Sequence, residues 1–389
     1  MTITAKVLAD TYNTYTGSRL TTFELYYPRF IHSEVMTYRM WSRSASSSRA
    51  IPVKTMIKNI LADPAMPLHW GANQKGMQAD QENRDADGNY VPVWAYADEE
   101  GYDPATAEDD APVRYVKKAF LPDMAWKVAM WAAVHVAKAF DRAGYHKQIV
   151  NRLLEPFMHI RVIVTATDYD NMFAQRIHPD AQPEFQVLAK AIKAAMLASN
   201  PVNFSQQYEE DLGEHFHHLP YITAEDKVFI KTWAAEAWPE LDAVEKAKYQ
   251  DDRHFHAWTL MKVCAARCAR VSYRLHDGTV PDIMDDLRLA NDLIASGHWS
   301  PFEHACTPCG CPNYHYNLRG FVNFRNMLDQ WHSVLKQREA VLSNANMLAA
   351  LTGGEVVEGP DGTPFVVQSS ELTEDFDQGT VPPKGRTLN

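Results

Sequence analysis

The sequence contains 389 residues, of which 46% are hydrophobic and 22% are charged. This composition is typical of a folded globular protein and excludes a disordered or fibrous chain. Lysine and arginine number 38 and aspartate and glutamate 49, so the formal net charge is −11. Nonspecific nucleic-acid binding requires a broad basic surface, so we expect no nucleic-acid partner.

Targeting signals are missing from the sequence. No apolar run approaches the roughly 20 residues that a membrane helix needs, and the N-terminus has no apolar core behind a basic start. The five cysteines, an odd number in a long chain, do not predict a secreted disulfide framework. We therefore expect no membrane partner, no signal peptide and a cytoplasmic location.

In chain order, the first elements are a strand-rich region and a helix. Residues 23–35 are dense in aromatic and β-branched side chains, which favours strands. Residues 53–61 have helical spacing, and Pro52 suits a first helical turn. Residues 81–112 are acidic and rich in turn formers, which predicts a solvated insertion. A calcium loop beginning at Asp85 is excluded because the required glycine and glutamate positions do not match.

Further helices are predicted in the second half of the chain. Trp126, Met130 and Val134 recur at helical spacing within 124–143 and predict a core face. Residues 183–199 predict one helix and residues 225–248 one or two. Residues 281–296 predict an amphipathic helix that Gly297 ends.

Two clusters of polar residues have the composition of an anion-binding site. The segment 39–49 sets Arg39 and Arg49 around several serines, and guanidinium and hydroxyl groups suit phosphate oxygens. The segment 151–184 places arginines and histidines among apolar residues, where a buried arginine needs a partner or a ligand. An ordinary polar turn would explain the first pattern, and Arg–Glu ion pairs would explain the second.

A third cluster, residues 297–315, allows two interpretations. It contains possible zinc ligands, namely His304, Cys306, Cys309, Cys311 and His315. Their spacing is not that of a regular zinc site and no second C-x2-C pair exists, so we predict no metal. In the other interpretation, Gly297 ends a helix, and His298 and Ser300 begin a strand that faces a cleft. Gly-rich nucleotide-binding motifs are absent, so a dinucleotide would not use a Rossmann turn.

Together the three clusters resemble the signatures of the flavin-dependent thymidylate synthases, the thymidylate-synthase-complementing (ThyX) family. That family carries R-H-R-x-x-S-x-N-x-x-S-x-R. Residues 37–49 match it, with the spacing kept, at Arg39, Ser42, Ser47 and Arg49. The departures from the signature are Thr37 for arginine, Tyr38 for histidine and Ser44 for asparagine.

The other two clusters extend the resemblance over residues 23–324. The second cluster is similar to the family's R-x-x-x-P at Arg152, to N-x-x-x-x-R at Asn171 and Arg176, and to A-Q-x-E at 181–184. Residues 269–273 and 297–304 look like the family's opening segment, which comes first in the common short members and last here. This order resembles a circularly permuted, enlarged branch often carried by phages, and a phage-encoded protein would work in the host cytoplasm.

The resemblance implies an α+β fold in which helices flank a central antiparallel or mixed sheet, permuted and with helical insertions. We expect one catalytic domain over residues 1–352, with insertions near 73–123 and 200–257. An acidic, flexible tail is expected at 353–389. Family active sites form between subunits, so a homotetramer with shared active sites is expected.

The reaction implied by the resemblance moves a one-carbon unit from methylenetetrahydrofolate to C5 of dUMP, giving dTMP. Reduced FAD supplies the hydride and NADPH reduces the flavin again. In the family no cysteine attacks the pyrimidine ring. Fixed cationic donors and correct positioning therefore carry the chemistry.

Site residues follow from the matched positions. The catalytic residues implied are Arg176, Arg49 and Ser47. The substrate-binding residues implied are Glu34, Ser47, Arg49, Arg152 and Arg176. The flavin-binding residues implied are Thr37, Tyr38, Arg39, Asn171, His298 and Ser300. In this scheme Arg176 lies at the carbonyl edge of the pyrimidine. Phosphate and sugar are held by Ser47, Arg49 and Arg152, and Glu34 stands where the family usually has a glutamine that also contacts the nucleotide.

Three alternatives stay open. The same scaffold could act on dCMP, or deliver a hydroxymethyl group, to make a modified DNA precursor. Glu34 motivates this alternative, because a carboxylate can accept a hydrogen bond from a cytosine amino group. The protein could also be a non-catalytic nucleotide-binding protein, as the three departures suggest, or a zinc-binding structural module. Residues 70–78 have no assigned role beyond a loop near the site.

Overall fold

The computed structural model describes most of the N-terminal part of the chain and little of the C-terminal part. The described residues are 1–77, 79–98, 115–204, 217–246, 248–272, 282–330, 346, 349, 354–358 and 364–368. The chain divides into two compact units, Met1–Arg325 and Asn326–Asn389. In the second unit β12 (Gly354–Glu358) pairs antiparallel with β13 (Pro364–Gln368). Most of the predicted tail lies outside the described residues, and the boundary at residue 352 stays a prediction.

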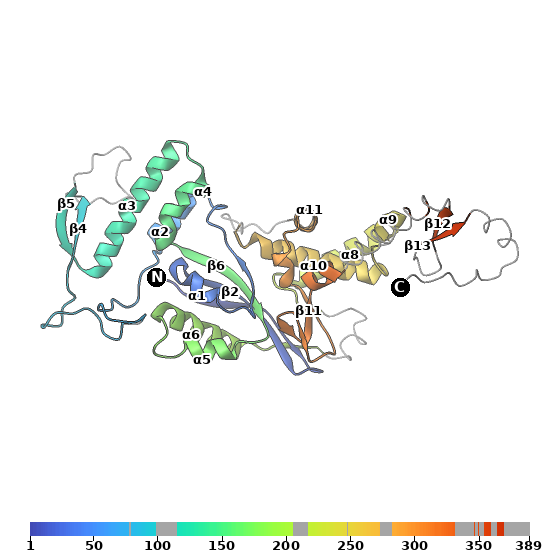
Figure 1. Ribbon diagram of the computed structural model, residues 1–389, viewed down its shortest axis with the longest axis horizontal. Helices are drawn as coiled ribbons and strands as arrows, with labels where there is room; N and C mark the ends of the chain where they lie inside the picture. The colour runs from blue at the N-terminus through green and yellow to red at the C-terminus, as the bar shows by residue number, and fades with distance from the viewer. Residues whose placement is uncertain are drawn as a thin grey trace. The chain divides into compact units, whose positions relative to one another are not determined.

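A five-stranded mixed sheet in the order β3-β6-β2-β1-β7 is the centre of the first unit (Figure 1). Its strands are β1 (Thr4–Asn13), β2 (Ser18–Pro28), β3 (Ser42–Ala45), β6 (His159–Ala166) and β7 (Val202–Phe204). Only β7 pairs parallel, with β1. The α+β class with a central mixed sheet is thereby confirmed, whereas the family fold and the permuted order stay predictions.

Side-chain alternation gives this sheet two different faces. One face carries Phe23 and Leu25 of β2 with Val162 and Val164 of β6, and all four are fully buried. The helices α5 (Asp170–Arg176) and α6 (Pro183–Ala198) cover this face, and the apolar side of α6 joins the same core (Figure 1). The opposite face of the sheet carries threonines and charged residues and is called the polar face.

A second, smaller core lies beside the sheet. It is built from α2 (Val53–Ala62), α3 (Pro122–Arg142), α4 (Lys147–Val150) and the 3-10 helix η2 (Asn151–Phe157). Met130 and Val134 are buried in it, which confirms the core face predicted for α3. Trp70 packs edge-on against Trp126, with ring centroids 6.2 Å apart, so the segment of unassigned role lies beside α3; its last residue is outside the described range.

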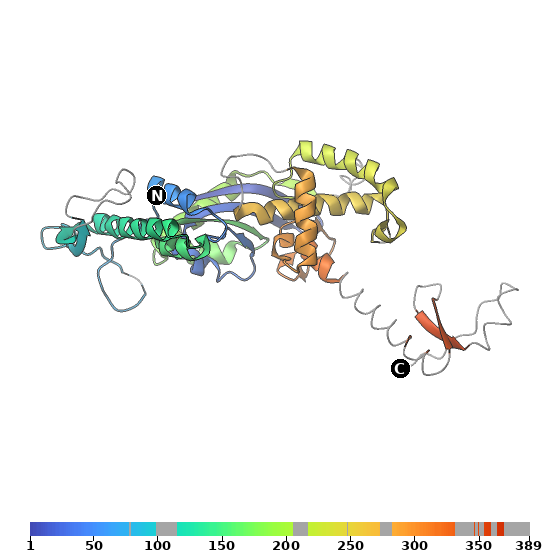
Figure 2. The same ribbon diagram turned by 90° about the horizontal axis from the view of Figure 1, so that it is seen from above.

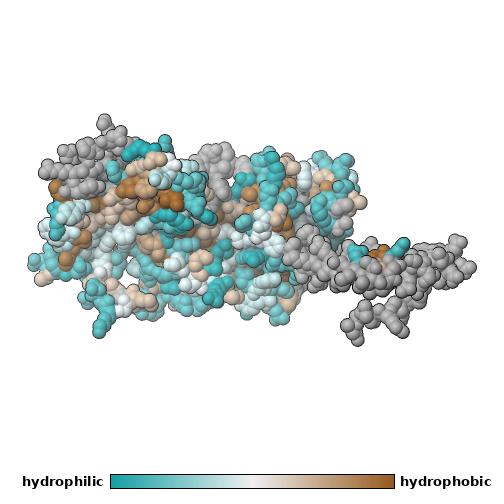
Figure 3. Space-filling model, turned by 45° about the horizontal axis from the view of Figure 1, so that its top comes forward, coloured by the Kyte–Doolittle hydropathy of each residue, from teal (hydrophilic) through white to brown (hydrophobic). Residues whose placement is uncertain are grey.

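Exposed apolar side chains lie on the surface of the elements that form this smaller core. The hairpin of β4 (Val93–Asp98) and β5 (Tyr115–Phe120) precedes α3. Figure 3 shows hydrophobic residues on the surface around α2 and α3. Leu121 and Val136 are among the exposed ones there.

A helical group covers the polar face of the sheet. It contains α8 (Ala224–Glu240), α9 (Ala243–Lys246), α10 (Asp252–Ala269) and α11 (Ile283–Ala295), with the 3-10 helices η3 (Arg270–Ser272) and η4 (Ser300–Glu303). Figure 2 shows α11 lying across α10. The helix α10 is buried on nearly all sides from Phe255 to Cys268, which removes the one-sided spacing that identifies an amphipathic helix from sequence.

Most predicted helices are present. The segments 53–61, 124–143, 183–199, 225–248 and 281–296 form α2, α3, α6, α8 with α9, and α11. Gly297 follows α11 with a φ of 73°, the left-handed conformation that a terminating glycine adopts. In the described part of the chain, no helix has both the length and the apolar character needed to cross a bilayer.

One strand prediction is confirmed only in part and another is wrong. Of residues 23–35, the part up to Pro28 lies in β2 as predicted, but the next residues form η1 (Arg29–Ile31) and α1 (His32–Val35). His298 and Ser300 do not begin a strand, because Ser300 opens η4 and Pro301 occupies its first turn. Strands follow later, as β8 (Cys306–Pro308), β9 (Tyr314–His315), β10 (Leu318–Arg319) and β11 (Phe321–Asn323).

Candidate functional site

The strand β3 is the place where the three predicted clusters meet. It belongs to the first cluster and pairs along its length with β6 of the second, so that Ser42 lies opposite Thr165. From the third cluster, His304 Nε2 lies 3.0 Å from Ser44 Oγ, although the two residues are 260 positions apart. Asn317 also donates a hydrogen bond to Ser42 Oγ at 2.9 Å. The fold therefore brings all three clusters to one edge of the sheet.

The loop after β3 is held in place by the second cluster. The fully buried Asn151 donates hydrogen bonds to the carbonyl oxygens of Ser48 at 2.7 Å and Ile51 at 2.9 Å. Ser48 Oγ donates to Glu155 at 2.8 Å, and Glu155 also accepts from Arg152 at 3.0 Å. These contacts bring the loop that contains Ser47 and Arg49 beside Arg152.

The loop between Ser46 and Ile51 borders a cavity of about 350 Å³. Lys58 of α2 and Arg161 of β6 supply positive charge to its wall, and Thr55 supplies a hydroxyl. The carboxylate in the wall, Asp63, is paired with the N-terminal amino group of Met1 at 3.2 Å. Arg161 is likewise paired, with Glu24 at 3.3 Å, so Lys58 is the charge of this wall that is left to favour an anion. Arg49 and Arg152 are exposed, so the same region offers two further guanidinium groups.

A second group of predicted residues surrounds Arg176. Its Nε donates to the hydroxyl of Tyr38 at 2.8 Å, and its guanidinium lies 3.3 Å from a carboxylate oxygen of Glu34. The same guanidinium is stacked 4.8 Å from the ring centre of Phe185. Burial raises the pKa of Glu34, and the charge of Arg176 opposes that rise. These contacts give Arg176 a fixed orientation.

The two groups lie on different sides of the sheet. Tyr38 and Phe185 belong to the core on the α5 and α6 face. The cavity beside residues 46–51 is lined by Tyr26 and Arg161, which point to the polar face. One chain therefore presents the predicted substrate residues as two separate sets.

The predicted flavin residues are mostly exposed. Arg39 and Asn171 have exposed side chains with no hydrogen-bond partner among the described residues. Thr37 Oγ1 donates to the carbonyl oxygen of Glu34 at 2.7 Å. His298 follows α11 and lies 3.0 Å from the hydroxyl of Ser296, and Ser300 is exposed at the start of η4. Tyr38 uses its hydroxyl on Arg176, and its ring is stacked on Trp41, with ring centroids 5.0 Å apart, and lies edge-on to Phe185.

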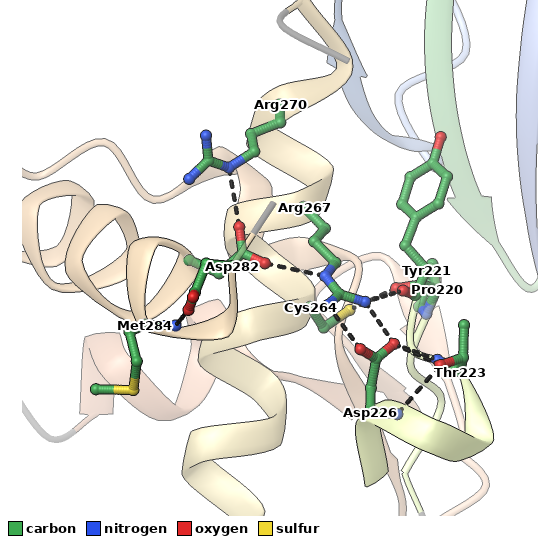
Figure 4. Close-up of polar contacts among 10 residues, drawn as sticks. Pro220, Tyr221, Thr223, Asp226, Cys264, Arg267, Arg270, Asp282 and Met284 are labelled. Carbon is green, nitrogen blue, oxygen red and sulfur yellow. Dashed lines mark hydrogen bonds and ion pairs between the residues drawn. The ribbon is translucent and has the colours of Figure 1, made fainter. Parts of the chain in front are cut away.

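Sequence reasoning missed a buried ion-pair network in the helical group. Arg267 donates two hydrogen bonds to Asp226, at 2.6 and 2.8 Å (Figure 4). It donates a third to Asp286 at 3.0 Å. Arg270, from the third set of matched residues, donates to the other oxygen of Asp286 at 2.9 Å. Although burial acts to raise it, hydrogen bonds from Arg267 and Thr223 bring the pKa of Asp226 down to about 2. The available signal is Arg267 among the small and apolar side chains of residues 263–269 in α10.

Sequence reasoning also missed the polar face of the sheet. Thr22 and Thr165 are fully buried there, in strands whose other buried side chains are mainly apolar, and their hydroxyls lie 2.6 Å apart. His218 contacts Thr22 at 2.7 Å. Buried hydroxyls and imidazoles must find partners, and these find one another.

The cysteines do not form a metal centre in the described part of the chain, where no group of three or more His, Cys, Asp or Glu side chains is arranged to hold an ion. Cys306 is buried, and burial raises the pKa of its thiol. Cys309 and Cys311 are only partly buried.

Comparisons with known proteins give a weak structural likeness. No family model matches the sequence, and no curated protein matches it. Two solved structures of the UMP/dUMP methylase PolB from Streptomyces cacaoi are similar, one bound with 5-Br dUMP and one with 5-Br UMP. They share 14% and 15% sequence identity, cover 50% of this chain and 90% and 88% of their own, and have TM-scores of 0.31 and 0.27. TM-scores this low do not establish a common fold, so the function must be inferred from the chain's own residues.

Proposed function

We propose that the protein is a flavin-dependent nucleotide methyltransferase that transfers a one-carbon unit from methylenetetrahydrofolate to C5 of dUMP and releases dTMP. The observation that carries the proposal is the meeting of the three matched clusters at β3, through the contact of Ser44 with His304 and the two bonds from Asn151 to the following loop. These segments are far apart in the sequence, and a shared site gives a reason for their meeting.

The nucleotide phosphate is assigned to Ser47, Arg49 and Arg152. Exposed guanidinium groups beside a hydroxyl suit phosphate oxygens, which accept bidentate hydrogen bonds from arginine. The cavity wall adds the charge of Lys58.

The pyrimidine is assigned to Arg176 and Glu34. Since these residues lie on the other side of the sheet from the phosphate residues, a second subunit would supply one of the two sets. This assignment requires at least two subunits, and the resemblance implies a homotetramer. Sedimentation equilibrium of the purified protein tests it, and a monomer at micromolar concentration would contradict it.

Arg176 is proposed to polarise a ring carbonyl, so that negative charge gathers on that oxygen and C5 becomes nucleophilic. Its bonds to Tyr38 and Glu34 hold it in place before the reaction begins, which is the source of electrostatic stabilisation in an enzyme site. No protein thiolate is needed in this scheme. The fully buried thiols of Cys264 and Cys306 are unsuited to attack, because burial raises the pKa of each.

The residues proposed to hold the flavin fit such a group in chemistry. Arg39 offers an exposed guanidinium for a phosphate and Asn171 an exposed amide. Tyr38 is assigned to the flavin by the resemblance alone, because its ring is stacked on Trp41. The positions of Thr37, His298 and Ser300 at the surface leave them free to line the same ligand. Bound FAD would supply the hydride, with NADPH as its reductant.

Product analysis by mass spectrometry tests the proposal. Purified protein receives FAD, NADPH, methylenetetrahydrofolate and equal amounts of dUMP and dCMP, and we expect dTMP. The Arg176→Gln variant serves as a matched control and should form little product. A methylated or hydroxymethylated dCMP would establish the alternative reaction on the same scaffold.

Two further measurements separate the non-catalytic alternatives. A protein that purifies without flavin, binds none when it is added and forms no product would overturn the proposal in favour of a nucleotide-binding protein. Stoichiometric zinc in metal analysis of the purified protein would support the zinc-binding module instead.

A further inference from the structure

A small hairpin near the end of the first unit carries exposed aromatic rings and a charged side chain that the proposed site does not use. The strands β9 and β10 pair antiparallel, with His315 opposite Leu318, so that Tyr316 and Asn317 form a two-residue turn. The other exposed side chains of this β9–β10 hairpin are those of Tyr314 and Arg319. None of the motifs that carry the family resemblance includes these residues.

The turn of the β9–β10 hairpin is fastened to the segment that carries Arg39. The Asn317 side chain donates hydrogen bonds to the carbonyl oxygen of Met40 at 3.1 Å and to Ser42 Oγ at 2.9 Å. Met40 directly follows Arg39, whose exposed guanidinium is assigned to a flavin phosphate in the proposed function. The turn therefore lies next to a segment of the proposed flavin site.

The strands of the hairpin are fastened to the segment that leads to Asn171. The Tyr314 hydroxyl donates to Asp168 at 2.9 Å, and the backbone N–H of Arg319 donates to Thr167 Oγ1 at 3.2 Å. These two acceptors follow the end of β6 and come just before α5, in whose first turn Asn171 lies. The hairpin thus connects the two segments that carry the proposed flavin residues of β3 and α5.

The backbone of Tyr316 is strained. Its φ is 56°, in the left-handed region that glycine and asparagine adopt readily and other residues rarely. Glycine and asparagine are also the usual residues where a two-residue hairpin turn needs a positive φ. The Tyr316 side chain is 67% exposed and forms no hydrogen bond among the described residues, so no such bond offsets the strain. Strained residues of this kind gather at ligand sites, where the strain belongs to the function.

Two exposed arginines at this end of the sheet have no acidic partner. Neither Arg39 nor Arg319 forms an ion pair with a described residue, although the formal net charge of the chain is −11. Arg319 instead lies over the ring of Tyr314, with its guanidinium carbon 5.1 Å from the ring centre. A guanidinium donates parallel hydrogen bonds to phosphate oxygens, so two such groups suit a diphosphate.

We propose that the β9–β10 hairpin is a further part of the flavin dinucleotide site, in which Arg319 joins Arg39 at the diphosphate and the ring of Tyr316 stacks on one ring system of FAD. A dinucleotide has both a diphosphate and flat heterocycles, and an exposed aromatic ring suits the latter. The strain at Tyr316 then holds its ring in the orientation that the ligand requires. The inference deepens the proposed function and rests on it, because it takes Arg39 and Asn171 as flavin residues.

Equilibrium binding of FAD, followed by flavin fluorescence, tests the role of Arg319. Arg319→Gln should weaken FAD binding about tenfold and leave the binding of riboflavin, which has no phosphate, unchanged. Arg288→Gln is the matched control, since Arg288 is also exposed but lies on α11, where it pairs with Asp285. An unchanged dissociation constant for FAD in Arg319→Gln, or an equal loss for riboflavin, would overturn the assignment of Arg319 to the diphosphate.

Two variants of Tyr316 separate binding from folding. Tyr316→Leu removes the aromatic ring and should weaken FAD binding about fivefold, whereas Tyr145→Leu, at a tyrosine that is 58% exposed after α3, should not. Tyr316→Gly also relieves the backbone, so it should weaken FAD binding while it raises the midpoint of thermal unfolding by about 2 °C. Unchanged FAD binding together with a lower midpoint would make Tyr316 a structural residue and overturn its part of the inference.

The outcomes separate this inference from the proposed function. If the unmodified protein binds no FAD, both fail. If it binds FAD and forms dTMP while the Arg319 and Tyr316 variants bind FAD as tightly as it does, the proposed function holds and this inference alone fails. A change of sedimentation in these variants with unchanged FAD binding would assign the hairpin to a contact between subunits instead.

Discussion

Arg267 and Asp226 form a bidentate ion pair inside the helical group, with N–O distances of 2.6 and 2.8 Å and an arginine that is only 3% exposed. The same guanidinium reaches Asp286, so one residue of α10 connects α8 to α11. These helices support η3 and η4, which pack against β3 and β6. The network therefore fixes the wall behind the candidate site.

Removal of this arginine should be strongly destabilising. Arg267→Met leaves the buried carboxylates of Asp226 and Asp286 with less compensation, and breaking a buried pair in this way costs about 3–5 kcal/mol. Urea denaturation gives the free energy of unfolding. Arg288→Met is the matched control, because Arg288 pairs with Asp285 on the exposed side of α11, where about 0.5 kcal/mol or less is expected. Equal losses in the two variants would show that the buried network does not act as described.

Arg49 should control the affinity for the nucleotide phosphate. Arg49→Ala removes an exposed guanidinium without disturbing the core, so folding should be unchanged while dUMP binding weakens about tenfold or more, as expected for a hydrogen bond to a charged group. Isothermal titration calorimetry measures the dissociation constant. Deoxyuridine, which has no phosphate, should bind both proteins equally, and a matching loss for deoxyuridine would move Arg49 away from the phosphate.

Tyr38 should act on the reaction through Arg176. Tyr38→Phe keeps the ring that stacks in the core and removes the hydroxyl that accepts from Arg176 Nε at 2.8 Å. Arg176 then loses part of its orientation, so kcat for dTMP formation should fall about tenfold while the protein stays folded. Steady-state kinetics with dUMP separates kcat from KM, and an unchanged kcat with a raised KM would instead assign Tyr38 to binding alone.

How much the sequence predicts depends on the kind of pattern. The helices α3 and α6 were predictable because their buried residues repeat on one side, whereas α10 is buried all round and has no such repeat. The signature loop and its partners could be found by their spacing. Thr22, Thr165 and His218 could not, because the contacts that pair them join residues 143 and 196 positions apart and depend on strand register. The same long-range pairing is what separates the substrate residues into two sets.

The buried histidines should make the protein sensitive to acid. Burial lowers the pKa of His218 and His304 to about 3, against about 6.5 in an unfolded chain. The unfolded state therefore binds protons that the folded state excludes, so the stability is fully present above pH 6.5 and is lost as the pH falls toward 3. Each histidine contributes a slope of up to about 1.4 kcal/mol per pH unit in that window. Asp226 acts only below about pH 4, because its pKa is held at about 2.

Urea denaturation at intervals from pH 7.5 to pH 4.5 measures this slope apart from the effect of Asp226. The His304→Gln variant should have a shallower slope by about one histidine's share, since glutamine takes up no proton. His178→Gln is the control, because His178 is exposed and its removal should leave the slope unchanged. A slope in the unmodified protein near zero between pH 6.5 and pH 4.5 would mean that the two histidines take up protons in the folded state as readily as in the unfolded chain, which would contradict the lowered pKa of both.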